Sequence, residues 1–421
     1  MIDIRLLREK PDEVRAAYER LGTPVDLAGV TTADARVRDL KNESQTLQAE
    51  QNRLSKEIGR AAAGEAREKA KADSTALKEK IEKLNVELAT AESGLDTLLL
   101  ELPNLPHPSV PVGKDESENV VLREEGKKRS YDFTPKPHWE LGTALDIIDF
   151  ERGVKISGSR FYVLKDWGAR LQRALITLML DLHTQKHGYV EIYPPYMVRR
   201  ECLVGTGNLP KFGENLFRVQ DADLILIPTA EVPVTNLYRD EILEPGRLPI
   251  YHVAYTPCWR NEQMSAGRDV RGIKRVYQFD KVEMVKFVAP ETSQAELTTL
   301  IDNAEDICKA LQIPYRLLQL CTADLGTAVM KYDLELWAPG VQEWLEVSSC
   351  ANFGDYQARR ANLRYRPAAG AKPEFLHTLN GSGLALPRVV IAIMENYQQA
   401  DGSIAIPDVL KPYMGGVEII G

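Results

Sequence analysis

Two long stretches near the start of the chain repeat hydrophobic residues at alternating steps of three and four. The first covers residues 37–58 and the second covers residues 77–98. A seven-residue repeat of this kind is typical of helices that pack along a single seam. Gly59 and Gly64 interrupt the sequence between them, so the pattern predicts two helices of about 30 residues in an antiparallel coiled-coil hairpin about 45 Å long.

The proline-rich segment "ELPNLPHPSVPVG" (101–113) ends this region, because proline cannot continue a helix. Beyond it the hydrophobic pattern changes. Apolar strands such as "LILIP" and "EWLEVSSCANF" alternate with helices, and several connections have the length of a hairpin turn. This arrangement predicts an α+β fold with a mostly antiparallel sheet flanked by helices. We therefore expect a helical domain with a long arm at 1–110 and a second domain at 111–421.

Composition narrows the class of protein only slightly. The 421 residues are 44% hydrophobic and 27% charged, with a formal net charge of -8. Such a chain is typical of a globular protein, and any contact with nucleic acid must come from a local basic patch. No apolar run reaches the length of a membrane span, and the charged N-terminus is unlike a signal peptide. With five scattered cysteines as well, the sequence favours the reducing cytoplasm.

One segment mixes charged and aromatic residues on the same strand parity. In "WRNEQMSAGRDVRGIKRVYQFDKVE" (259–283), Arg275, Phe279 and Glu283 share one parity with Tyr277 and Lys281 between them. A surface hairpin with a salt-bridged face is one interpretation. The other is a floor under a flat, charged ligand, since rings stack and arginine grips phosphate or carboxylate with two parallel hydrogen bonds.

Three segments of the chain resemble the motifs of class II aminoacyl-tRNA synthetases. The pieces W-R-x-E and R-x-x-x-F-x-x-x-E resemble motif 2, "HGYVEIYPPYMV" resembles motif 1 with Pro195 as its proline, and "NGSGLALPRVV" resembles motif 3 with Arg388 as its arginine. The arm and the segments "PTAEVPVTNL", "LEVSSC", "DYQARRANLRYR", "HTLNGSGLA" and "PDVLKPYMGG" further resemble the seryl-tRNA synthetase family. The resemblance covers nearly the whole chain in the family's order.

The resemblance implies a two-step reaction. Serine and ATP would form seryl-adenylate and pyrophosphate, and serine would then pass to the 3' end of serine tRNA. Whether selenocysteine tRNA is also a substrate stays open. A carboxylate that is already ionised needs no general base for the first step. A pocket that hydrogen-bonds a hydroxyl rejects alanine strongly, whereas one extra methyl group on threonine is worth only about 1–3 kcal/mol.

Site residues follow from the matching motif positions. Arg260 and Arg388 would be catalytic: Arg260 would contact the α-phosphate and the serine carboxylate, and Arg388 would stack above the adenine or reach the γ-phosphate. Glu262 would read the adenine amino group and Phe279 would stack beneath the ring. The serine site would comprise Thr229, Ala230, Glu231, Arg260, Glu283, Asn380 and Ser382. The ATP site would comprise Arg260, Asn261, Glu262, Val276, Phe279, Glu346, Val347, Ser348, Ser349 and Arg388.

The resemblance also implies Mg²⁺ as the metal that accompanies ATP, held by Glu346 and Ser349. We expect no zinc, since the cysteines have no C-x-x-C spacing and the histidines show no metal spacing apart from His183 and His187, four residues apart. Packing is the favoured role for that pair.

The arm has two interpretations. Residues 1–110 carry 17 Lys and Arg against 20 Asp and Glu, so a coiled coil for dimerisation is a fair interpretation of composition alone. The resemblance favours binding to serine tRNA by shape and phosphates, aided by basic residues near the tip. The very apolar helix at 171–187 favours either a homodimer interface or a core position.

A few positions depart from the family's pattern, namely Asn261, Met264, Tyr277 and Pro387, which places the geometry of the motif 2 loop in doubt. Three rival functions also stay open. The first is an amino-acid:carrier-protein ligase, which would lack the arm. The others are a non-catalytic paralogue, which would have lost Arg260, Glu262 or Arg388, and a coiled-coil scaffold, which the second half of the chain opposes.

Overall fold

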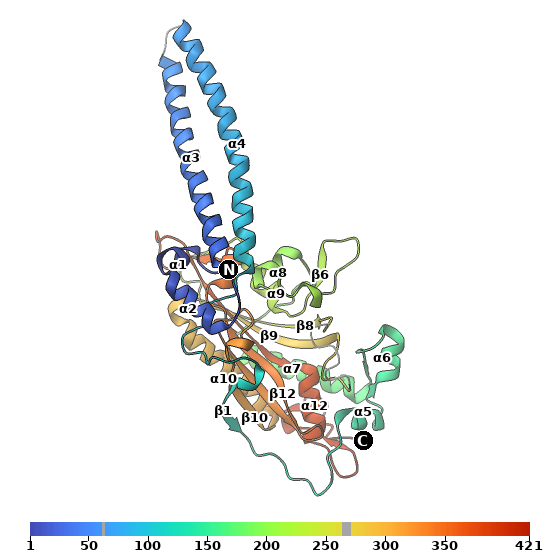
Figure 1. Cartoon of the computed structure of the whole chain (residues 1–421). Helices are drawn as coiled ribbons and strands as arrows, with labels where there is room; N and C mark the ends of the chain where they lie inside the picture. The colour runs from blue at the N-terminus through green and yellow to red at the C-terminus, as the bar shows by residue number, and fades with distance from the viewer. Residues whose placement is uncertain (61–63, 263–270) are drawn as a thin grey trace. The chain divides into compact units, whose positions relative to one another are not determined.

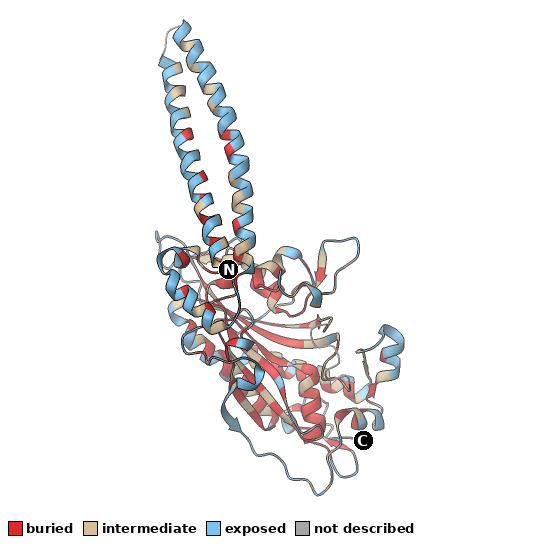
Figure 2. Ribbon diagram, viewed as in Figure 1, coloured by how far each residue is buried: buried red, intermediate tan, exposed pale blue. Residues whose placement is uncertain are grey.

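The computed structural model describes residues 1–60, 64–262 and 271–421. These residues form two compact units. The helical unit consists of Ile2–Glu19 and Thr23–Pro103, and the sheet unit consists of Met1, Arg20–Gly22 and Asn104–Gly421. Each unit has its own buried residues (Figure 2).

The helical unit contains the predicted hairpin. Two short helices, α1 (Ile4–Glu9) and α2 (Pro11–Leu21), precede the long helices α3 (Leu27–Arg60) and α4 (Glu65–Glu101), which lie side by side (Figure 1). At 1.5 Å per residue, α3 and α4 are about 51 and 56 Å long. They exceed the expected 45 Å because each helix begins before its first seam position: α3 begins at Leu27, ten residues before Val37, and α4 begins at Glu65, twelve residues before Leu77.

The hydrophobic repeat forms the contact between α3 and α4, as predicted. Leu40 and Leu47 of α3 are buried together with Ile81 and Leu84 of α4, while most of the other positions are exposed (Figure 2). The polar seam residue Gln51 donates from Nε2 to Ser74 Oγ at 2.8 Å. Three ion pairs also join the two helices, namely Arg36–Glu87, Lys41–Glu92 and Lys80–Glu43.

The sheet unit is built on an eight-stranded sheet in the order β1-β10-β11-β12-β15-β9-β8-β4. All neighbours are antiparallel except β4 and β8. The predicted α+β fold with a mostly antiparallel sheet is therefore confirmed. The strands are β1 (Val120–Glu125), β4 (Val190–Glu191), β8 (Ile250–Trp259), β9 (Gln278–Val288), β10 (Tyr315–Gln319), β11 (Met330–Ala338), β12 (Glu343–Asn352) and β15 (His377–Ala385).

Three helices pack on this sheet, α7 (Asp166–Gln185), α10 (Ser293–Leu311) and α12 (Leu386–Asn396) (Figure 1). Helix α12 is buried over almost its whole length, and α10 buries one face. Helix α7 was expected at a dimer interface or in the core. Its Leu171, Leu175 and Met179 belong to the main hydrophobic core, so the core accounts for much of its apolar surface.

Smaller elements complete the sheet unit. The helices are α5 (His138–Ala144), α6 (Phe150–Ser157), α8 (Arg200–Thr206), α9 (Glu231–Thr235) and α11 (Tyr356–Arg360). The strands are β2 (Ile148–Asp149), β3 (Val163–Leu164), β5 (Met197–Arg199), β6 (Leu224–Leu226), β7 (Ile242–Leu243), β13 (Arg364–Tyr365), β14 (Glu374–Phe375), β16 (Ile404–Ala405) and β17 (Ile419–Ile420). A bilayer-spanning helix, long and apolar enough for that role, does not occur within the described ranges.

The segment "YVEIYPPYMV" contributes to two short strands, Val190–Glu191 to β4 and Met197–Val198 to β5. Pro194 and Pro195 lie between them and have no N–H to donate to a neighbouring strand. One local prediction differs from the structure. Strand β9 begins at Gln278, so Tyr277 precedes it. The Tyr277 ring packs edge-on against Phe161 and Phe217, with ring centroids 5.8 and 5.9 Å away.

Candidate active site

A cavity of about 740 Å³ lies in the sheet unit. Its wall comes from β9, β11, β12 and β15, from the starts of α9 and α12, and from segments outside the sheet such as Thr206–Asn208, Phe212–Leu216 and the stretch that follows β8. Most predicted site residues line it, although they are far apart in sequence. They are Thr229, Glu231, Arg260, Glu262, Val276, Phe279, Glu283, Glu346, Val347, Ser349, Asn380, Ser382 and Arg388.

Strand alternation explains how β9 contributes to this wall. Phe279, Lys281 and Glu283 line the cavity, while Asp280 lies on the other face of the strand. The register then places Ser382 of β15 directly opposite Glu283. The charged and aromatic residues of this strand therefore face a cavity and not the solvent side of a surface hairpin.

One end of the cavity is rich in arginine. The Arg260 guanidinium lies 5.1 Å from the centroid of the Phe279 ring, and its Nε donates to the Pro228 carbonyl at 3.2 Å. The Glu262 carboxylate accepts from Arg275 Nη1 at 2.9 Å. Glu262 also has a backbone φ of 51°, a left-handed conformation that side chains other than glycine rarely adopt. Strain of this kind is often found at functional sites.

Arg388 and Glu346 meet at the far side of the same end. Arg388 Nη1 donates to the backbone oxygen of Glu346 at 2.7 Å and lies 3.3 Å from its carboxylate. Burial works to raise the pKa of Glu346, but the charges of Arg388, Lys331 and Arg260 outweigh it and hold that pKa below its ordinary value. Glu346 is therefore a carboxylate at neutral pH.

Asp333 stands behind this pair and was not predicted. Ser349 Oγ donates a hydrogen bond to its carboxylate. Burial and the nearby Glu346 raise the pKa of Asp333 to about 7. Within the described residues, no group of three or more His, Cys, Asp or Glu side chains is arranged to hold a metal ion. A Mg²⁺ ion bound here would depend on one or two carboxylates plus the phosphates of a nucleotide, which is its usual mode of binding.

The other part of the cavity is lined by the carboxylates of Glu231, which is half-buried, and Glu283, which is buried. Glu231 Oε1 accepts from Gln357 Nε2 at 2.6 Å, and its backbone N–H donates to Thr229 Oγ1 at 3.2 Å. Burial and the charge of Glu283 raise the pKa of Glu231 to about 7. Glu283 forms an ion pair with Lys281 and lies 3.5 Å from Ser382 Oγ.

Asn380 has a polar atom with no hydrogen-bond partner. Its Nδ2 is buried and makes no hydrogen bond to any described residue. The amide lies close enough to Glu231 to help lower its pKa, although without the geometry of a hydrogen bond. A buried, unpaired donor in the wall of a cavity is suited to a ligand with an acceptor oxygen.

Three predicted residues lie outside the cavity wall. Ala230 is packed in a hydrophobic cluster, and Ser348 is buried with its Oγ donating to the Ser382 carbonyl at 2.6 Å. Asn261 bonds through its backbone N–H to the Asn215 carbonyl at 3.0 Å. The departure noted at Met264 lies outside the described residues. Sequence reasoning placed Lys281 on the ligand-facing strand parity but did not count it among the site residues, and it did not identify Lys331 or Asp324; all three line the wall. The signal for Lys281 was its position on the same strand parity as Phe279 and Glu283.

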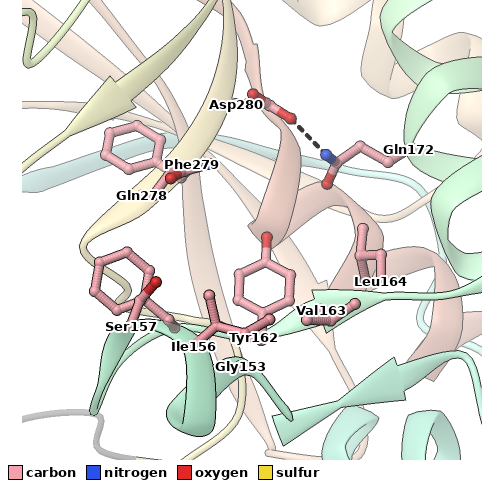
Figure 3. Close-up of a pocket in the computed structure, with 11 residues that line it drawn as sticks. Gly153, Ile156, Ser157, Tyr162, Val163, Leu164, Gln172, Gln278, Phe279 and Asp280 are labelled. Carbon is pink, nitrogen blue, oxygen red and sulfur yellow. Dashed lines mark hydrogen bonds between the residues drawn. The ribbon is translucent and has the colours of Figure 1, made fainter.

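A second cavity of about 230 Å³ shares Phe279 with the first. In Figure 3, Tyr162 lines this second cavity and directs its hydroxyl toward Asp280. Gln172 donates a hydrogen bond to the Asp280 carboxylate. Phe279 thus separates the two cavities. The rings of His183 and His187 are hydrogen-bonded to each other. His183 also contacts the Gly383 carbonyl and His187 contacts the Asp306 carboxylate, so both rings are held by protein contacts.

A mostly antiparallel sheet whose larger cavity gathers arginines, an aromatic ring and the Glu231–Glu283 pair is the arrangement expected of a class II aminoacyl-tRNA synthetase. Comparison with known families agrees. Residues 216–397 match the tRNA synthetase class II core domain (G, H, P, S and T), and residues 1–106 match the seryl-tRNA synthetase N-terminal domain. The chain belongs to the seryl-tRNA synthetase family and is an aminoacyl-tRNA ligase whose amino acid is serine.

Similar proteins match over the full length. The serine–tRNA ligase of Herpetosiphon aurantiacus is 61% identical over 100% of both chains, and that of Thermomicrobium roseum is 62% identical over 100% of this chain and 95% of its own. The seryl-tRNA synthetase of Pyrococcus horikoshii, solved with ATP, has a TM-score of 0.92 and 38% identity, covering 100% of this chain and 99% of its own. The Naegleria fowleri enzyme, solved with AMP, has a TM-score of 0.88 and 28% identity, covering 100% and 98%.

Proposed function

We propose that the cavity binds ATP at its arginine end and serine at its carboxylate end, and joins them there as seryl-adenylate. The observation that carries this proposal is the distribution of charge within one cavity. Arg260 and Arg388 suit the phosphates, and the half-buried Glu231 and the buried Glu283 suit an ammonium group and a hydroxyl.

Each predicted residue then has a role. Phe279 stacks beneath the adenine, Glu262 accepts from the adenine amino group, and the Val276 backbone lines the pocket. Thr229 and Glu231 bind the serine ammonium, while Glu283, Asn380 and Ser382 surround its hydroxyl. Val347 lines the ATP site, and Ala230, Asn261 and Ser348 support their neighbours from outside the wall, on the basis of the contacts described above.

The first chemical step needs alignment more than acid–base chemistry. The serine carboxylate attacks the α-phosphorus of ATP, the bond to the β-phosphate oxygen breaks, and pyrophosphate leaves with the electron pair. Arg260 contacts both the carboxylate and the α-phosphate and so holds the reacting atoms together. Arg388 offsets the negative charge that accumulates on the departing phosphates.

We further propose that Glu346 and Ser349 hold Mg²⁺ together with the ATP phosphates. Glu346 is an ionised carboxylate in the cavity wall, its side chain is 46% exposed, and Ser349 lies beside it. When bound, the ion neutralises phosphate charge. No step is assigned to zinc.

The second step transfers serine to the 3' end of serine tRNA. We propose that residues 1–110 bind this tRNA through the α3–α4 hairpin and that residues 111–421 form the catalytic domain. The basic residues near the end of the hairpin suit RNA phosphates, namely Arg60, Arg67, Lys69, Lys71, Lys78, Lys80 and Lys83. Selenocysteine tRNA is included in the proposal, since shape readout by an arm does not depend on base sequence.

We also propose that the enzyme works as a homodimer in the cytoplasm. Val190, Tyr193 and Met197, on and after the edge strand β4, are exposed apolar residues that a second copy would cover. The five cysteines are free thiols, which fits a reducing compartment. Sedimentation at micromolar concentration tests the dimer, and a fully active monomer would contradict it.

Serine-dependent ATP–pyrophosphate exchange without tRNA tests the first step. We expect exchange with serine, less with threonine, and none with alanine or glycine. Arg260→Ala should abolish it, whereas Arg200→Ala, at an exposed position at the start of α8 outside the cavity, should leave it unchanged. Exchange that survives Arg260→Ala would refute the assignment of this site. Charging of serine tRNA and selenocysteine tRNA by the full chain, and its loss on removal of the hairpin, tests the second step.

A further inference from the structure

Lys281 is a buried cation at the serine end of the cavity. It lies between Phe279 and Glu283 on the cavity face of β9, and its side chain is 9% exposed. Its ammonium pairs with Oε2 of Glu283, whose side chain is only 2% exposed. Ser382 Oγ lies 3.5 Å from that same oxygen. Both contacts of Glu283 thus fall on Oε2, so that Oε1 is the oxygen left for a ligand.

The charges around Lys281 come from several elements. Glu283 shares its strand, Glu231 faces it from α9, and Arg260 follows the end of β8. The Cys258 thiol of β8 is also near, and burial raises the pKa of that thiol. The neutral groups nearby are Thr229, Asn380, Ser382 and Gln357. At the serine end itself, two carboxylates therefore face one ammonium, and a second ammonium from the substrate completes the balance.

Two neighbouring carboxylates in a pocket shielded from water cannot both ionise easily. Burial first, and then the charge of Glu283, raises the pKa of Glu231 to about 7, whereas the charge of Lys281 lowers it. Without Lys281, Glu231 would retain its proton at higher pH. A protonated carboxyl pairs poorly with an ammonium group and competes as a donor with the serine hydroxyl.

We propose that Lys281 is a positioning residue for serine that acts through Glu283: its ammonium holds Oε2 of Glu283, so that Oε1 accepts the substrate hydroxyl, and it balances the negative charge of the pocket. This inference rests on the proposed assignment of Glu231 and Glu283 to the serine site. To the residues proposed to contact serine, it adds Lys281, which sets the charge of the pocket.

The test is the pH dependence of kcat/KM for serine in ATP–pyrophosphate exchange, measured from about pH 6 to about pH 8.5, below the titration of the serine ammonium. In the wild type, kcat/KM should rise with pH through an inflection near the pKa of about 7 of Glu231. In Lys281→Met the inflection should move up by at least about one pH unit, so that kcat/KM falls about fivefold or more at pH 7 and recovers as pH rises. The KM for ATP should stay the same.

Two further variants separate charge from packing. Lys281→Arg keeps the positive charge and should keep the wild-type inflection. Lys286→Met is the matched control, because Lys286 is a buried lysine of the same strand that pairs with Glu296 at 2.9 Å but lies outside the cavity wall. It should lower stability without moving the inflection. A Lys281→Met enzyme that loses activity equally at every pH would overturn the inference.

A double variant tests whether Lys281 acts through Glu283. We expect Lys281→Met to have little further effect in a Glu283→Gln background, because the carboxylate it serves is gone. If Glu283→Gln alone leaves the KM for serine unchanged, the proposed serine pocket is wrong. If Glu283→Gln raises that KM but Lys281→Met still adds its full effect, the pocket stands and the inference about Lys281 fails.

Discussion

Asn380 gives the sharpest contrast between binding and stability. Its Nδ2 is buried in the cavity wall, and no described residue accepts a hydrogen bond from it. Leaving a buried donor unpaired costs about 1–3 kcal/mol, which a serine oxygen would recover on binding. Asn380→Ala should therefore raise the KM for serine about 5- to 150-fold, since each 1.4 kcal/mol corresponds to about a factor of ten. The same change should alter the free energy of unfolding of the ligand-free protein by less than about 1 kcal/mol, because the folded state loses an unpaired donor and the side chain faces open space.

Asn396 provides the matched control. It is buried near the end of α12, away from the cavity, and its Nδ2 donates to the Trp337 carbonyl at 2.7 Å and the Ala392 carbonyl at 2.8 Å. Asn396→Ala should lower the free energy of unfolding by about 2–3 kcal/mol and leave the KM for serine unchanged. Urea denaturation and pyrophosphate exchange measure the two quantities. The reasoning is refuted if Asn380→Ala destabilises the protein as much as Asn396→Ala does, or leaves the KM for serine unchanged.

Three other predictions follow from the fold and the site. Loss of one base stack costs about 1–3 kcal/mol of binding free energy, so Phe279→Ala should raise the KM for ATP and change the KM for serine little. Kinetics at saturating co-substrate would show this, and an equal rise in both KM values would contradict a stacking role. Raising the salt concentration from about 50 to about 200 mM should weaken tRNA binding at least about tenfold in a filter-binding assay, while pyrophosphate exchange without tRNA should stay nearly constant. Equal sensitivity of both to salt would argue against phosphate contacts. The buried Glu395 carboxylate accepts from the backbone N–H groups of His138, Gly340 and Val341. Glu395→Ala should therefore lower the free energy of unfolding, measured with heat or urea, by about 3 kcal/mol or more, and a decrease below about 1 kcal/mol would contradict this.

Periodicity revealed the fold class because its signal is local. The coiled-coil seam, the helices at 293–311 and 386–396, and the strands around 278–288 each follow from residues close in sequence. The ends of the elements were harder to predict. Helix α3 extends ten residues before its first seam position, where no repeat marks it, and β4 already ends at Glu191, before Pro194 and Pro195.

The candidate site was found largely through ordered motifs. Thirteen of the predicted residues line one cavity, as their positions in the family's pattern led us to expect. Motif positions alone did not distinguish the residues in the wall from those behind it. Ala230 and Ser348 are neighbours of site residues along the chain, yet strand and helix geometry directs them into the protein interior.

The sequence by itself determined the local elements, the helical hairpin and the set of charged and aromatic residues available for binding, because these depend on spacing along the chain. Tertiary structure alone decided which charges meet. Lys281, Glu283 and Ser382 come together only because β9 and β15 pair in one register, and Glu231 joins them from α9. Burial then shifts the pKa of Glu231, since desolvation and the field of a neighbouring carboxylate arise only after distant segments have packed together.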